Sequence, residues 1–147
     1  MSAAGSSESA VGPDADEFRQ LVDGALRELD ADERGGALVR ATDLSLRITI
    51  TDLDLVIRVA PSDEPDHHLT WNYDDEGPLA KLDLRMDSAT AHSYLQGDES
   101  LAIAIAKGRV RLRGESRFAL LYLPVMSHVA GPYGRLVRER FPHLAPA

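Results

Sequence analysis

The segment from Leu82 to Tyr133 constrains the fold most, because the spacing of its apolar residues changes several times in quick succession. Apolar and polar residues alternate from Leu82 to Met86, as in a half-buried strand. Helical spacing then follows in two short stretches, each ended by a glycine. Alternation returns over residues 109–114, and an apolar helix begins at about Arg117. The segment therefore predicts a strand, two short helices, a basic strand and a long helix.

The segment contains two motifs, YLQGD at residues 94–98, where the first short helix ends, and AIAKGRVRLRG at residues 104–114, where the second helix leads into the basic strand. In their order and spacing these motifs resemble the sterol carrier protein type two family of small lipid-binding domains. The resemblance extends over residues 44–140 by order of elements and over residues 88–130 by motif. It implies a sheet and helices that enclose an apolar tunnel for sterols, fatty acids or fatty acyl-CoA.

The N-terminal part of the chain begins with a polar stretch and then becomes helical. Residues 1–13 contain almost no bulky apolar side chains, so we expect a disordered tail. From Asp14 to Leu29 apolar residues recur at spacings of three and four, which predicts an amphipathic helix. Gly35-Gly36 interrupts this pattern, so the helix either ends near Asp32 or breaks there and resumes for a turn.

Alternating stretches predict the remaining strands at residues 44–51, 53–59 and 69–73, in addition to the strand at 82–86. The phase of the alternation changes at Asp52, which indicates a tight turn or bulge between two antiparallel strands. We expect these four strands to form a meander. With the basic strand, they predict an α+β fold with a predominantly antiparallel five-stranded sheet, covered on one face by helices that enclose an apolar cavity.

The last predicted helix is apolar on almost all sides between Phe118 and Val129, and it contains Pro124. Such a helix lies either within a core or against something that is not protein. The family resemblance implies the second arrangement, with this helix forming part of the tunnel wall. The run AGPYG at residues 130–134 predicts a break, followed by a last helical turn or two up to Phe141.

Length and charge restrict the class of protein further. The chain has 147 residues, and we assign residues 14–147 to a single lipid-binding domain. A formal net charge of −8 argues against nonspecific attraction to nucleic acid or to anionic membranes. The absence of cysteine excludes disulfides and thiolate metal sites. Since the sequence contains neither a membrane-spanning apolar run nor a signal peptide pattern, we expect a cytoplasmic protein.

The resemblance and the phase of each element suggest which side chains line the cavity. We expect the non-enzymatic binding or carriage of a lipid or other hydrophobic small molecule, without a cofactor, a metal or a nucleic acid. Transfer of the ligand from water into the cavity would contribute about 0.8 kcal/mol of binding free energy for each CH₂ group that is buried. The sequence does not determine the oligomeric state. The candidate lining residues are Trp71, Leu84, Met86, Tyr94, Leu101, Ile105, Phe118, Leu121, Tyr122, Val125 and Met126.

Two other functions remain open at this point. The same cavity could hold a hydrophobic biosynthetic intermediate, with His92, Tyr94 or His128 in an acid–base role. The domain could instead bind a partner protein and have a filled cavity. The sequence contains no paired base and nucleophile, no Gly-x-Ser-x-Gly motif and no zinc-binding histidine spacing, so we do not expect an enzyme.

Basic residues concentrate on the predicted strand at 109–114. Arg109, Arg111 and Arg113 share one face of it, with Lys107 and Arg117 nearby. These side chains could be a solvated face that protects a sheet edge from pairing, a dock for an acyl-phosphate or a lipid head group, or a nucleic-acid contact. The last alternative is disfavoured by the acidic chain and by the absence of interleaved aromatic residues.

Overall fold

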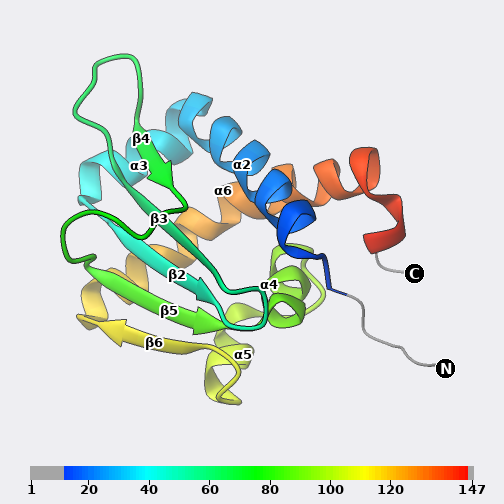
Figure 1. Ribbon diagram of the computed structural model, residues 1–147. Helices are drawn as coiled ribbons and strands as arrows, with labels where there is room; N and C mark the ends of the chain where they lie inside the picture. The colour runs from blue at the N-terminus through cyan, green and yellow to red at the C-terminus, as the bar shows by residue number, and fades with distance from the viewer. Residues whose placement is uncertain (1–11, 146–147) are drawn as a thin grey trace, which may run out of the picture.

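The computed structural model describes residues 12–145 (Figure 1). The predicted disordered tail, residues 1–13, therefore lies almost entirely outside the described residues. In chain order the elements are α2 (Ala15–Ala31), α3 (Glu33–Thr42), β2 (Leu46–Ile50), β3 (Leu55–Pro61), β4 (Leu69–Asn72), β5 (Leu82–Met86), α4 (Ser88–Leu95), α5 (Leu101–Ala106), β6 (Arg111–Gly114), α6 (Ser116–Arg140) and a short 3₁₀ helix (Pro142–Leu144).

Helix α2 begins at a capping box. The Asp14 carboxylate accepts a hydrogen bond from the Glu17 amide at 2.8 Å, and the Glu17 side chain accepts one from the Asp14 amide at 3.0 Å. The helix ends at Ala31, and the next residue, Asp32, with an extended backbone (φ −80°, ψ 118°), is both its C-cap and the N-cap of α3. The helix thus breaks and resumes, but it resumes for ten residues rather than for one turn. Gly35 and Gly36 are accommodated within α3.

The five strands form one sheet in the order β4-β3-β2-β5-β6. The predominantly antiparallel arrangement is confirmed, with one exception, since β2 and β5 are parallel. The predicted four-strand meander is wrong, because β5 lies beside β2 and not beside β4. Alternation determines which side chains face the core, but it does not determine which strand is the neighbour. Ser45 fixes the position of β5 by accepting hydrogen bonds from the amides of Lys81 and Leu82, at 2.9 and 3.1 Å.

Helices α2, α4 and α6 lie on one face of the sheet (Figure 1). Strand register aligns the inward side chains in rows across the strands. One row runs from Leu112 through Leu84 and Ile48 to Ile57, and the next contains Leu82, Leu46, Val59 and Trp71. Leu82 and Leu84 are fully buried. The inner face is therefore a continuous apolar surface on which the helices pack.

The outer face of the sheet carries charged side chains. Asp75 accepts two hydrogen bonds from the Arg47 guanidinium, both at 2.7 Å, and one from Arg58 at 3.3 Å. The bonds from Arg47, which outweigh the effect of desolvation, lower the pKa of Asp75 to about 2. Towards the other edge, Arg85 faces Arg111 across β5 and β6, and both are exposed. Ion pairs therefore neutralise the charged side chains on only part of this face.

Helix α6 is continuous from Ser116 to Arg140, so the predicted break at residues 130–134 is wrong. Pro124 and Pro132 each remove one backbone donor from it. The Ser127 hydroxyl donates to the Pro124 carbonyl at 2.6 Å. Beyond Pro132 the helix buries Tyr133 and Val137 completely. Packing of this C-terminal part outweighs the local cost of the prolines. The spacing of apolar residues in the sequence could not show this packing. Among residues 12–145, no helix is long and apolar enough to cross a membrane.

Candidate functional site

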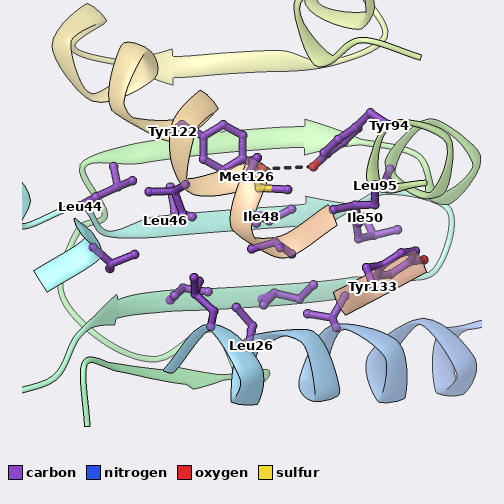
Figure 2. Close-up of a pocket in the computed structure, with 18 of the residues that line it drawn as sticks. Leu26, Leu44, Leu46, Ile48, Ile50, Tyr94, Leu95, Tyr122, Met126 and Tyr133 are labelled. Carbon is purple, nitrogen blue, oxygen red and sulfur yellow. Dashed lines mark hydrogen bonds between the residues drawn. The ribbon is translucent and has the colours of Figure 1, made fainter. Parts of the chain in front are cut away.

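An apolar cavity lies between the inner face of the sheet and the helices that cover it (Figure 2). Its volume is about 60 Å³. Strands β2 and β3 form its floor, and α2, α4 and α6 form most of its other walls. Its lining residues are Phe18, Val22, Leu26, Leu29, Val39, Leu44, Leu46, Ile48, Ile50, Ile57, Val59, Ala91, Tyr94, Leu95, Tyr122, Val125, Met126, Val129 and Tyr133.

Four of the predicted lining residues meet at this cavity. Tyr94 reaches it from α4, and Tyr122, Val125 and Met126 reach it from α6 (Figure 2). The other predicted residues do not line it. They either are buried elsewhere in the core or pack against the core while partly exposed: Trp71, Leu84, Met86, Leu101, Ile105, Phe118 and Leu121.

Trp71 and the residues of β5 lie outside the cavity because of the strand order. Trp71 is on the edge strand β4, and its indole N–H donates to the Asp23 carboxylate of α2 at 2.8 Å. Tyr73 also donates to Asp23, at 3.3 Å. Burial opposes ionisation of Asp23, but the hydrogen bonds from Arg27 and Trp71 outweigh it and lower the pKa of this carboxyl. These bonds fasten β4 to α2 beside the cavity.

Sequence reasoning missed the contribution of α2. Phe18, Val22, Leu26 and Leu29 of this helix all face the cavity. Their helical spacing correctly indicated an apolar stripe, but nothing in it distinguishes a stripe against a void from one against a filled core. The strand pattern likewise indicated that Ile48 points inward, without indicating that it would border a cavity.

Three tyrosine hydroxyls are the polar groups of the cavity wall. The hydroxyls of Tyr94 and Tyr122 lie 3.1 Å apart and form a hydrogen bond (Figure 2). Burial raises the pKa of Tyr94 to about 12 and that of Tyr122 well above its usual value. Both hydroxyls therefore keep their protons at neutral pH. The Tyr133 hydroxyl lies 2.8 Å from Nδ1 of His92.

His92, a candidate acid–base residue, joins α4 to the C-terminal turn. Its Nε2 lies 2.8 Å from the carbonyl oxygen of Leu144. The side-chain amide nitrogen of Gln96 also lies 2.9 Å from Nε2 and donates to the same Leu144 carbonyl at 3.0 Å, while Nδ1 is hydrogen-bonded to the Tyr133 hydroxyl at 2.8 Å. The residue is 8% exposed and its two ring nitrogens are both engaged. His92 thus has a structural partner on each side and does not itself line the cavity.

The other histidines lie outside the cavity and contact polar partners. His128 Nδ1 is 3.4 Å from a carboxylate oxygen of Asp32, and His143 Nε2 is 2.9 Å from one of Glu17. His67 Nδ1 lies 2.6 Å from the carboxylate of Asp30, and His68 Nδ1 lies 2.8 Å from the backbone carbonyl oxygen of the same residue. Within residues 12–145, histidine and carboxylate groups do not form a cluster that could hold a metal ion.

The basic strand is β6, at the edge of the sheet. Arg109 precedes it and is ion-paired with Glu99, while Arg117 lies 3.4 Å from Glu115. Arg111 and Arg113 are exposed on the strand itself. The edge position agrees with the interpretation that these charges protect a free strand from pairing. The head-group and nucleic-acid interpretations remain predictions.

No protein-family model and no curated protein sequence matches the chain. Several solved structures are similar to it in fold. A crystal structure of sterol carrier protein 2 has a TM-score of 0.55 and 13% identity, over 76% of this chain and 94% of that one. A conserved hypothetical protein from Thermus thermophilus has a TM-score of 0.56 and 14% identity, over 92% and 95% of the two chains.

A larger protein contains a similar unit. The stereoselective inverting sec-alkylsulfatase Pisa1 from Pseudomonas sp. matches 64% of this chain with a TM-score of 0.52 and 18% identity. The chain spans only 14% of the length of that sulfatase. Together these similarities assign the fold: a helix-covered sheet of the sterol carrier protein 2 type. The chain has the sterol carrier protein 2 fold, as its sequence motifs predicted.

Proposed function

We propose that this chain binds a hydrophobic small molecule in the cavity over β2 and β3 and carries it without chemical change. The observation that carries this proposal is the composition of the cavity wall, which consists of apolar side chains and three tyrosines. A water-poor apolar slot favours a ligand that loses contact with water. Structural neighbours named as sterol carrier proteins support the same class of ligand. Sterols, fatty acids and fatty acyl-CoA are candidate ligands within this class.

Binding requires the cavity to enlarge. Ligand sites typically measure about 300–1,000 Å³, whereas this cavity measures about 60 Å³. Met126 lies at the cavity, and its unbranched side chain can adopt other rotamers at low cost. Pro124 lies in the part of α6 that borders the cavity and leaves one carbonyl of that helix without its usual backbone donor. We therefore propose that the ligand enters by displacing side chains of α6.

The first experiment is extraction of the purified full chain with organic solvent and identification of co-purified lipids, followed by uptake of a fluorescent fatty acid and, separately, of its uncharged methyl ester. Val125→Trp should fill the cavity and abolish uptake. Val129→Phe is a second blocking variant in case the first does not fold. Leu120→Trp is the matched control, because Leu120 is 70% exposed on the same helix. Uptake that is equal in the folded blocking variants and the control would contradict the proposal.

The small cavity volume favours a second candidate function, in which the cavity stays filled and the domain binds a partner protein. Leu120 and Leu123 of α6 are exposed apolar residues that could contribute to such a surface. This candidate predicts no co-purified lipid and no probe uptake by the folded wild-type protein. The same extraction and uptake experiment therefore distinguishes the two functions.

A further inference from the structure

The cavity wall contains no charge to neutralise a ligand. Among the described residues that line it, none is Lys, Arg, His, Asp or Glu. A carboxylate or phosphate placed inside would lose its water without gaining a counter-ion, which is strongly unfavourable. A neutral ligand has no such penalty. The wall therefore discriminates against a fully enclosed anionic group.

The hydroxyl pair of Tyr94 and Tyr122 has a hydrogen-bonding capacity that the protein does not use. The two hydroxyls carry two protons, and the bond between them uses one. Within residues 12–145 neither hydroxyl contacts another acceptor. A buried donor without an acceptor is destabilising. An acceptor oxygen on a ligand beside this pair would satisfy the second proton.

Tyr133 differs from this pair although it also lines the cavity. Its hydroxyl is already hydrogen-bonded to Nδ1 of His92, whose other ring nitrogen contacts Gln96 and the Leu144 carbonyl. The unused proton of the Tyr94–Tyr122 pair lies elsewhere in the wall, between α4 and the first half of α6 (Figure 2). Burial raises the pKa values of Tyr94 and Tyr122, so that this donor persists at neutral pH.

We propose that the cavity selects an uncharged hydrophobic ligand with one acceptor oxygen, a ketone, ester or ether, which accepts a hydrogen bond from the Tyr94–Tyr122 pair. This inference rests on the proposed function, because it specifies the ligand class of the same cavity. An ionised fatty acid is disfavoured unless its carboxylate remains in water. The uncharged wall selects against an anionic group, and the unused proton of the hydroxyl pair selects a ligand with an acceptor oxygen over an alkane.

A mixed-ligand competition tests this inference. The full chain is incubated with equimolar pentadecan-2-one, pentadecane and pentadecanoate and separated from free ligand by gel filtration, and the bound compounds are extracted and quantified. We expect the ketone to be retained about tenfold over the alkane, as for one additional hydrogen bond in a dry site, and in excess over the carboxylate. Equal retention of ketone and alkane, or preferential retention of the carboxylate, would overturn the inference and leave the proposed function intact.

Tyrosine variants identify the donor. In the double variant Tyr94→Phe/Tyr122→Phe, the ketone-to-alkane ratio should fall towards one while alkane retention is unchanged. Tyr94→Phe or Tyr122→Phe alone leaves the other hydroxyl with a free proton and should keep a preference for the ketone. Tyr73→Phe is the control, since that hydroxyl contacts Asp23 outside the cavity. In the wild type, the infrared carbonyl stretch of the bound ketone should lie at lower frequency than in alkane solvent, and the double variant should lose this shift. An unchanged ratio in the folded double variant would overturn the role of the pair. Failure of the folded wild type to retain any of the three compounds would overturn the proposed function itself.

Discussion

The two faces of the sheet are stabilised in different ways. The inner face consists of apolar rows such as Leu84–Ile48–Ile57, and the buried tyrosine hydroxyls of the helices packed on it stay neutral. The outer face depends on charges, with Asp75 bonded to two arginines and an unfavourable arginine pair at the other edge. Burial makes each inner contact worth far more than a solvent-screened outer one. Most of the folding free energy therefore comes from the inner face, whereas the dependence of stability on pH and salt comes from the outer face.

The largest expected effect is from truncation on the inner face. Leu84→Ala should lower the free energy of unfolding by about 2–5 kcal/mol, because it leaves a new void at a fully buried position. Thr70→Ala, at an exposed position of the sheet, should change it by less than about 0.5 kcal/mol. Guanidinium chloride unfolding measures both. Similar changes in the free energy of unfolding for the two variants would contradict the proposed difference between the two faces.

A methylene added to the buried core should act differently beside the cavity and away from it. Val129→Ile extends a lining residue into free space and should stabilise the protein by about 0.5–0.8 kcal/mol. Val110→Ile adds the same group at a buried position that does not border the cavity, and overpacking there should cost about 1 kcal/mol or more. Chemical denaturation gives both signs. Destabilisation of equal size in both would indicate that the cavity does not accommodate added volume.

Asp75 should give the outer face an acid dependence. Because the Arg47 hydrogen bonds lower its pKa to about 2, its contribution is complete above the unfolded pKa of about 4 and is lost as the pH falls to 2. Asp75→Asn should therefore be less stable than the wild type at pH 7, and the two should converge towards pH 2. Thermal unfolding at several pH values measures this. A difference independent of pH would exclude ionisation of Asp75 as its source.

The smallest expected effect concerns the arginine pair at the sheet edge. Arg111→Thr removes the like charge opposite Arg85 and should stabilise the protein by about 0.3 kcal/mol. Arg113→Thr is the matched control with the opposite sign, because Arg113 faces Asp83 on the same pair of strands. Denaturation at low salt and in 1 M NaCl checks the origin, since salt should reduce both differences. The same sign in both variants would favour a strand-propensity effect instead.

The fold could be predicted to a large extent because its signals are local. Alternation and helical spacing identified the strands and helices, and the Gly97 and Gly108 motifs indicated the fold that the structural comparisons support. The neighbour of β5 and the continuity of α6 through Pro132 could not be predicted, because each depends on packing between distant segments.

The candidate site was predicted less completely than the fold. The apolar phase of their helices predicts Tyr94 and Tyr122 as cavity-lining residues, but their mutual hydrogen bond depends on how α4 packs on α6. The alternation of its strand likewise predicts Leu84 as a lining residue, but Leu84 is in β5 and the cavity lies over β2 and β3. An apolar pattern specifies that a side chain is buried, and it contains no information on where packing is incomplete.

The parallel pairing of β2 with β5 has a consequence for folding kinetics. Strands β2 and β3 are joined by a four-residue turn, residues 51–54, and can pair early. Leu46 pairs with Leu82 across a segment of the chain that contains β3, β4 and the loop after β4. Contacts of this sequence separation carry a large loop-closure cost and form slowly. The central junction of the sheet should therefore lie near the rate-limiting step, so that Ile48→Val would slow refolding more than it would accelerate unfolding.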